Sequence, residues 1–334
     1  MRDSAWALRI ARGVMFWLLM TLPSAAFGLL EDEMVPEGKW FFRASVRQAT
    51  QQKFFDRGKN EGTLKDALIP DPELRGQIEG DITREIFRTD LLFTFGVSDR
   101  WNLSLDLPYL DMTQESSLVA APSTEAAAEL ERQQLQSRTL SGIGDVRLTS
   151  QHRPVFSDRA GFIWGYGLII PGGSQQTPYV DRTTFDLRSP LPAYFVFLHA
   201  TGYPGGSRSR FDFRVSAEKG FRADVDTPSG ERKYLDPGNR VAATVGYSRE
   251  IGPVALGGEA EWRVARETSL AGERFRDTVQ AFAGRFHVGY GNVAQLEEGP
   301  VVFPYQVLLE VEHIARGANT PRGSFFSLAF QTYC

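Results

Sequence analysis

The chain has 334 residues, with 37 Lys and Arg against 41 Asp and Glu, and a formal net charge of −4. This slight acidic excess excludes the basic footprint of a nucleic-acid-binding protein. The single cysteine, Cys334, excludes an intramolecular disulfide and a multi-cysteine metal site.

The N-terminus has the features of a secretory signal peptide. A basic region comes first and contains Arg2, Arg9 and Arg12. The run Val14–Leu22 is apolar, and Ser24, Ala25 and Ala26 supply the small residues that a signal peptidase needs. The apolar run is shorter than the ~20 residues that cross a bilayer as a helix, although an uncleaved anchor is the alternative. We expect cleavage of residues 1–26, export to the envelope of a Gram-negative bacterium, and a periplasmic segment at 27–38.

From residue 39 onward the chain repeats short segments in which apolar and polar residues alternate. In Trp101–Tyr109 every odd position is apolar and every even position is polar or Pro. Because side chains alternate across a strand, each segment has one apolar and one polar face. The pattern predicts twelve strands: Lys39–Gln48, Glu85–Val97, Trp101–Leu110, Gly144–Arg153, Gly161–Ile170, Leu191–Gly202, Arg210–Lys219, Arg240–Arg249, Val254–Ala265, Thr278–Gly289, Phe303–Ile314 and Ser324–Tyr333.

The connections between these strands differ in length. Four are long and polar: Gln51–Arg84, Asp111–Ile143, Pro171–Pro190 and Gly220–Asn239. Four are short: Ser98–Arg100, Pro154–Ala160, Tyr203–Ser209 and Glu250–Pro253. Their strict alternation is typical of outer-membrane barrels, which have short periplasmic turns and long outer loops. The last three links do not differ in this way, so the strand count is open in that third. One long loop contains Ser123–Leu135, where helix formers without Gly or Pro predict a short helix.

A soluble sandwich would show the same alternation. However, a soluble barrel of this many strands would be too wide for its side chains to fill. Aromatic residues also begin or end many apolar faces, as they do at a membrane interface: Trp40, Trp101, Tyr109, Tyr247, Trp262, Tyr290 and Tyr305. The sequence therefore predicts an all-β, antiparallel transmembrane barrel of about 12 strands over residues 39–334. Its expected partners are outer-membrane lipid, the barrel-assembly machinery and a small-molecule solute.

The polar faces of these strands would line the lumen of the barrel. They carry charges of both signs: Arg43, Arg47, Arg88, Asp90, Asp106, Asp145, Arg147, Asp212, Arg214, Glu218, Glu259, Glu261, Arg263, Arg285, Glu310 and Glu312. Such a mixed field can orient and pass polar solutes. Alternatively, these groups pair with one another, join neighbouring strands and narrow the lumen.

The sequence offers little support for catalysis. His287 has the luminal parity, His152 and His313 have the lipid parity, and His199 is ambiguous. No metalloprotease, nucleotide-binding or nucleophile-elbow motif is present. We therefore expect neither a catalytic site, a metal nor a cofactor.

Two glycine-rich segments, Gly142–Leu148 and Gly165–Gly173, carry a family resemblance. They resemble the bacterial "MetA-pathway of phenol degradation" family of outer-membrane transporters, and the hairpin at Gly96–Tyr109 is similar to the preceding hairpin of that family. The resemblance covers Phe87–Gly173. It departs at Gly172, where the family has Thr, and at the C-terminus, which ends on Cys rather than on an aromatic residue.

The resemblance implies a channel associated with the uptake of aromatic or other hydrophobic compounds. The glycines would either bend the wall or admit bulky neighbours. We expect Asp145, placed across from Gly165 and Gly167, to act as a luminal gate or constriction. Two alternatives remain: a structural or surface-interaction barrel with a closed lumen, and an outer-membrane hydrolase.

Overall fold

The computed structural model describes residues 34–334 apart from 57, 70–71, 121–134, 158, 173–190, 205–208, 227–230, 277 and 293–303. The predicted signal peptide at 1–26 lies outside the described residues. So does the predicted helix at 123–135, except for Leu135. In the part of the chain that the structure describes, no helix is long and apolar enough to cross a membrane.

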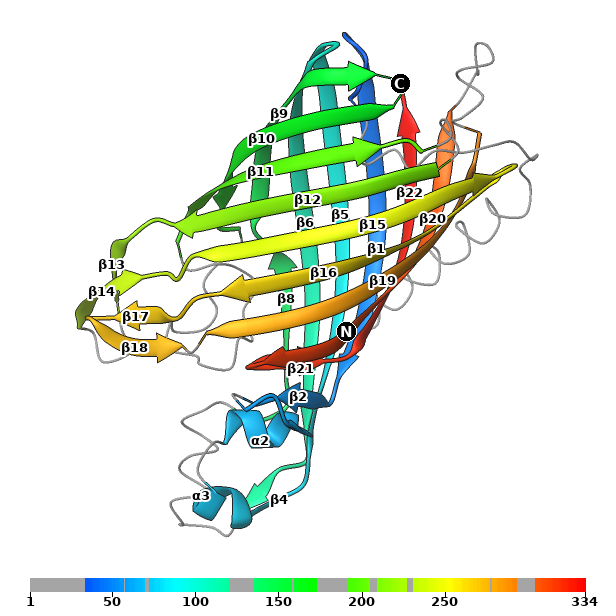
Figure 1. Cartoon of the computed structure of the whole chain (residues 1–334). Coiled ribbons are helices and arrows are strands. Elements are labelled where there is room, and N and C mark those ends of the chain that lie inside the picture. The colour runs from blue at the N-terminus through cyan, green and yellow to red at the C-terminus, as the bar shows by residue number, and fades with distance from the viewer. Residues whose placement is uncertain are drawn as a thin grey trace.

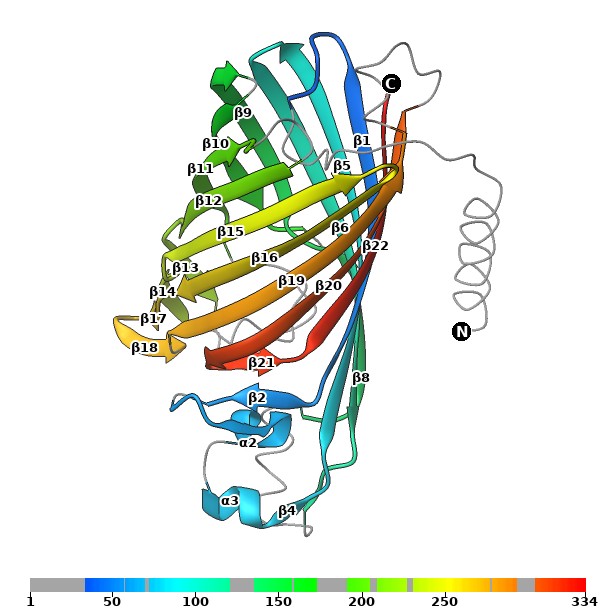
Figure 2. The same ribbon diagram turned by 45° about the vertical axis from the view of Figure 1, so that its right-hand side comes forward.

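The chain forms a closed antiparallel β-barrel in which the strands follow one another in sequence order (Figures 1 and 2). The first strand closes the barrel by pairing with the last, from Phe41 opposite Tyr333 to Ala49 opposite Phe325. The wall consists of β1 (Trp40–Gln51), β5 (Ile82–Ser98), β6 (Trp101–Ser116), β9 (Val146–Ser157), β10 (Ala160–Ile170), β11 (Ala193–Gly202), β12 (Ser209–Gly220), β15 (Arg240–Ile251), β16 (Val254–Ala265), β19 (Val279–Gly291), β20 (Tyr305–Ala318) and β22 (Ser324–Tyr333). The predicted twelve-stranded barrel is confirmed.

One strand of the wall is interrupted. The segment β8 (Arg138–Ile143), which the sequence assigned to a loop, pairs with the far half of β6, and β9 pairs with the near half. The change of partner occurs at Pro108, which has no N–H to continue the ladder. Its carbonyl instead accepts from the N–H of Gly144, in the gap between β8 and β9. The glycine-rich segment around residue 144 therefore marks an irregularity in the wall rather than the start of a strand.

The long loops are partly folded, which corrects their prediction as plain polar loops. One lobe contains β2 (Lys53–Phe55), β3 (Glu61–Thr63), α2 (Leu64–Leu68), α3 (Pro72–Gly76), β4 (Ile78–Glu79), β7 (Val119–Ala120) and β21 (Thr320–Arg322). Its small core is made by Leu64, Ile69, Ile78, Ile82 and Leu135. Each loop supplies too few apolar residues to form a core alone, so no single loop shows the pattern.

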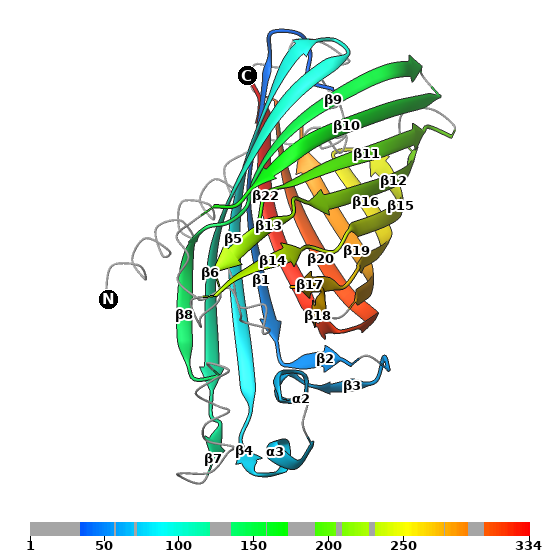
Figure 3. The same ribbon diagram turned by 90° about the vertical axis from the view of Figure 1, so that its left-hand side faces the viewer.

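A second, smaller lobe is a four-stranded sheet of β13 (Ala223–Asp226), β14 (Arg232–Asp236), β17 (Thr268–Leu270) and β18 (Glu273–Arg276). Both lobes lie at the end of the barrel opposite the C-terminus (Figure 3). The short turns, such as Asp99–Arg100 and Gly252–Pro253, lie at the other end. Short periplasmic turns and long outer loops assign the lobes to the outer end.

The outward face of the wall exposes apolar side chains, whereas a soluble protein turns such side chains towards its core. Along β11 the outward residues Tyr194, Val196 and Leu198 are about half exposed, at 47%, 50% and 52%. The inward residues that alternate with them, Phe195 and Phe197, are 8% and 5% exposed. An apolar band of this kind around the whole barrel is stable in lipid and not in water.

The segment before β1 turns into the barrel. Met34 packs with inward side chains of β10 and β11, and Val35 is 2% exposed. The buried amide of Asn102, in the orientation that satisfies both of its groups, accepts from the N–H of Val35 at 2.9 Å and donates to its carbonyl at 3.2 Å. The chain then passes over Gly96, which donates to the carbonyl of Lys39 at 3.0 Å.

Substitution of Gly96 by Ala should release this segment. The added Cβ would overlap the carbonyl oxygen of Pro36 and lie 2.5 Å from that of Val35. Overpacking against backbone costs about 1–3 kcal/mol. The free energy needed to open this segment should fall by that amount, so the amide of Val35 should exchange with deuterium faster. Gly284→Ala is the control, since nothing lies within 4 Å of its Cβ position. Equal exchange in both variants would refute this seating of the segment.

Candidate functional site in the barrel lumen

The inner face of the barrel carries an ion-pair cluster that spans neighbouring strands. Its members are Arg47, Glu259, Glu261, Arg263, Arg285, Glu310 and Glu312. Arg285 lies at its centre, with one guanidinium nitrogen 2.9 Å from Glu259 and another 3.3 Å from Glu312. Arg263 lies 2.6 Å from Glu312. The cluster therefore joins β16, β19 and β20 from the inside.

Strand register explains these contacts. Glu259 is directly opposite Arg285, and Arg285 is directly opposite Glu312, so opposite charges form one row across three strands. Arg47 joins the cluster from β1, although β22 lies between them. Its guanidinium reaches Glu310 at 3.3 Å because the intervening residue is the small Ser327. One cluster thus links strands from both ends of the described chain.

Further ion pairs lie around the rest of the lumen. On β12, Asp212 accepts from Arg210 at 2.8 Å and lies 3.0 Å from the imidazole of His199. Nearer the outer end, Arg240 lies 3.0 Å from Glu218. Two further ion pairs differ from these. Arg147 lies 3.9 Å from Glu218, which is a long distance for an ion pair, and Arg88 lies 2.6 Å from Asp90 on the same strand. Most luminal charges are therefore paired, as the narrowing alternative predicted.

The lumen also contains an apolar surface, the aromatic shelf, formed by Phe195 and Phe197 of β11. The two rings stack at a centroid distance of 6.5 Å. They lie against Gly165 and Gly167 of β10, where an added Cβ would collide with the rings and with strand backbone. The reading that these glycines admit bulky neighbours is the one that the structure supports. Met34, Ile163, Ile169 and Ala193 complete the same apolar cluster.

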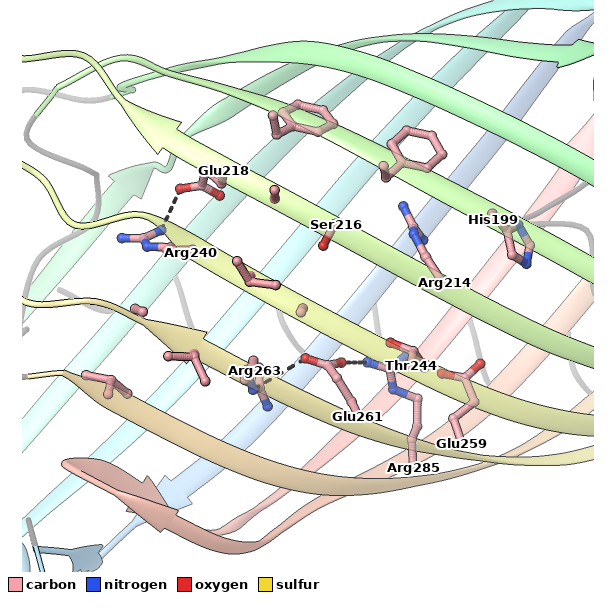
Figure 4. A pocket seen from close by; sticks show the side chains of 18 of the residues that line it. His199, Arg214, Ser216, Glu218, Arg240, Thr244, Glu259, Glu261, Arg263 and Arg285 are labelled. Atoms are coloured by element: carbon pink, nitrogen blue, oxygen red, sulfur yellow. Dashed lines mark hydrogen bonds and ion pairs between the residues drawn. The ribbon is translucent and has the colours of Figure 1, made fainter.

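A cavity of about 500 Å³ lies beside the aromatic shelf (Figure 4). Its lining includes Phe195, Phe197, His199, Arg214 and Thr244, together with part of the ion-pair cluster. In Figure 4, Arg214 stands apart from the paired groups, between Ser216 and His199. The cavity therefore combines two aromatic rings with a lining in which charged and polar side chains outnumber the apolar ones.

The structure places fifteen of the sixteen residues predicted to line the channel on the inward face of a strand. The exception is Asp145, which lies in the gap between β8 and β9. The expectation that it lies across from the two glycines of β10 is wrong, because Gln151 and Thr149 occupy those positions. Asp145 lies four and six residues before these two positions along the chain.

Several luminal residues were missed by sequence reasoning. The segment before His199 is apolar at both parities, so alternation does not show that Phe195 and Phe197 point inward. One sequence feature does indicate their inward position: Gly165 and Gly167 on the preceding strand leave room for the two rings. The sequence predicts Arg240 at the start of a strand. Its ion pair with Glu218 follows only from the register of β12 against β15.

The predicted interface aromatics lie on the outward face. Trp40, Trp101, Tyr109, Tyr247 and Trp262 are between 36% and 51% exposed, and Tyr290 is half-buried. Tyr305 differs, since it is only 5% exposed and stacks on Phe330. Trp101 also belongs to an outward stack in which the imidazole of His152 lies between it and Trp164, at 5.9 and 4.7 Å. This histidine is a wall residue. Among the described residues, no group of His, Cys, Asp and Glu is arranged to hold a metal ion.

A solved structure supports the fold. The alignment with the COG4313 outer membrane channel from Pseudomonas putida F1 covers 92% of this chain and 100% of that chain, with a TM-score of 0.65 and 13% identity. A Pseudomonas aeruginosa FadL homologue aligns at a TM-score of 0.42 and 9% identity, over 89% of this chain and 90% of the other. A mutant of the TodX monoaromatic hydrocarbon channel also aligns at 0.42, with 10% identity, over 90% of each chain. No family model and no curated protein matches the sequence.

The fold and the lumen together define a class. This chain is an antiparallel β-barrel of the outer-membrane type, with twelve strands and a lumen that combines paired charges with an aromatic shelf. The structural similarity at 13% identity concerns the fold alone.

Replacement of Glu312 by Gln should destabilise the barrel. The carboxylate is 3% exposed and lies near Arg47, Arg263 and Arg285, which are partly exposed at 33%, 40% and 24% and keep other carboxylate partners. A hydrogen bond to a charged group contributes about 1.5–3 kcal/mol, so we expect a loss of unfolding free energy of about that size. Unfolding of the refolded protein in urea, followed by its heat-modifiable migration on gels, measures the change.

The exposed pair of Glu231 and Lys233, at 64% and 41% exposure, supplies the matched control. Glu231→Gln should change the unfolding free energy by less than about 1 kcal/mol. Similar losses in the two variants would mean that the ion-pair cluster does not stabilise the barrel.

Proposed function

We propose that this chain is an outer-membrane channel for the passive uptake of small aromatic or hydrophobic molecules through a mixed-charge lumen. The aromatic shelf is the observation that carries the proposal. A pore for polar solutes has a polar, water-filled interior, whereas Phe195 and Phe197 present stacked rings beside a cavity of about 500 Å³. Apolar ligands bind in concave sites lined by aromatic side chains with a few placed polar groups.

The proposal includes the route to the membrane. Residues 1–26 act as a signal peptide that is removed on export, and the barrel-assembly machinery inserts the barrel into the outer membrane. The outward apolar band and its interface aromatics, such as Trp40 and Trp262, support contact with lipid. The similar barrel from Pseudomonas putida, described as an outer membrane channel, agrees with this role.

A specific observation favours the alternative of a closed-lumen structural or surface-interaction barrel. The ion-pair cluster links β1 to β16 across the inner face, and the segment at Met34 and Val35 lies inside the barrel. Both features narrow the lumen. In that case the two outer lobes would supply the interaction surface.

Loss of the aromatic shelf should lower uptake of aromatic solutes. Aromatic pairs contribute about 0.5–1.5 kcal/mol beyond area burial, so Phe195→Leu with Phe197→Leu should slow naphthalene uptake into proteoliposomes by about two- to ten-fold. The double variant Phe211→Leu with Phe213→Leu is the control, because those rings face outward at 54% and 50% exposure. Unchanged uptake in the shelf variant would contradict the proposal.

Conductance in a planar lipid bilayer separates an open channel from a closed barrel. We expect reproducible current steps from the refolded protein. Glu259→Gln should shift the reversal potential in a salt gradient towards anion preference, because a negative charge leaves the lumen. Silence from protein shown to be folded would favour the closed-lumen alternative.

A further inference from the structure

We infer that the lumen contains a binding site for an organic carboxylate with an apolar body, centred on Arg214. The inference rests on the proposed function, since the ligand reaches this site from the lumen of the channel. It goes beyond that function because it selects anionic aromatic compounds over neutral ones.

Arg214 differs from the other luminal arginines in its surroundings. Arg47, Arg263 and Arg285 each lie within 3.3 Å of a carboxylate oxygen. Arg214 is exposed to the cavity, and among the described residues no carboxylate lies within ion-pair distance of its guanidinium. Its guanidinium stands over the ring of Phe197, 4.8 Å from the centroid. The guanidinium therefore keeps its N–H donors for another acceptor.

The residues beside Arg214 offer further donors. In register it lies between His199 of β11 and Thr244 of β15, and Ser216 follows two residues later on the same inward face (Figure 4). The hydroxyls of Ser216 and Thr244 make no side-chain hydrogen bond to any described residue and line the same cavity. One guanidinium and two hydroxyls thus face one space.

A second cation lies close to this group. Arg147 of β9 stands over the ring of Phe195 at 5.7 Å, and its nearest carboxylate, on Glu218, is 3.9 Å away. Glu218 itself is held more closely by Arg240, at 3.0 Å. The aromatic shelf therefore carries one guanidinium on each ring: that of Arg214 has no carboxylate partner in the described part of the chain, and that of Arg147 has a distant one.

The charged side chains that line the cavity carry a net positive charge. Five arginines and four acidic side chains line it. The acidic groups, Asp212, Glu218, Glu259 and Glu261, each have a guanidinium partner within 3.4 Å. The excess positive charge is thus located at Arg214.

The chemistry of these groups selects a carboxylate. A guanidinium binds a planar carboxylate through two parallel N–H···O bonds, which are stronger than neutral hydrogen bonds. The aromatic shelf and Ala242, which lie on the same cavity, accept the apolar body of the ligand. A neutral aromatic compound can use the shelf but leaves Arg214 hydrated.

Calorimetric titration of the folded protein in detergent tests this site with two ligands of equal shape. We expect 2-naphthoate to bind the wild type about ten-fold or more tightly than neutral 2-naphthamide, as hydrogen bonds to charged groups imply. Arg214→Gln should lower the affinity for 2-naphthoate to that for 2-naphthamide. Arg214→Lys should retain part of the preference, because the charge remains and the paired N–H geometry is lost.

Arg249→Gln is the matched control, since Arg249 lies exposed on the outward face of β15. Equal affinity of the wild type for the two ligands, or a preference that survives in Arg214→Gln, would overturn the carboxylate site and leave the proposed channel standing. Failure of both ligands to bind, together with absence of naphthalene uptake, would overturn the site and the proposed function.

Discussion

The structure depends on one constraint: in a closed barrel every strand has a hydrogen-bonding partner on both sides. A lipid environment offers no substitute for a missing backbone partner, so the wall must close and its side chains must alternate. The pairing of β1 with β22 meets this requirement over nine residue pairs. Once the wall is closed, each charged residue faces either lipid or lumen according to its parity. The alternation of side chains along the closed wall therefore places these charged residues on its inward face.

Charges brought together inside the wall must then be compensated. Rows such as Glu259, Arg285 and Glu312 achieve this through register alone, without any turn or loop. The same cluster stiffens the wall and narrows the space within it. A solute can therefore bind only in the part of the lumen that the cluster does not occupy, beside Phe195 and Phe197. The sites that matter most for a solute are thus those where pairing is incomplete.

Much of this architecture could be predicted from the sequence. Period-two alternation located all twelve strands, because lipid outside and water inside impose opposite requirements on neighbouring residues. It failed where both parities are apolar, as at Phe195 and Phe197. It also failed around Gly144, where the wall is irregular. The outer lobes could not be predicted, since the core around Leu64 and Leu135 combines residues from loops that have no common period. Arg214 has no ion-pair partner among the residues that the structure describes, and this depends on the positions of carboxylates on other strands, which no local pattern contains.

The three-stranded sheet of β21, β2 and β3 has a consequence for the order of assembly. It pairs Lys53 with Arg322 and Phe55 with Thr320, so the first outer loop completes its structure only with residues from the last hairpin. Contacts of such long sequence separation form late, because the intervening chain must be ordered first. The first loop to be synthesised is therefore among the last to be finished. Because β2 follows β1 and β21 precedes β22 in the chain, we expect this sheet to form after β1 and β22 have paired.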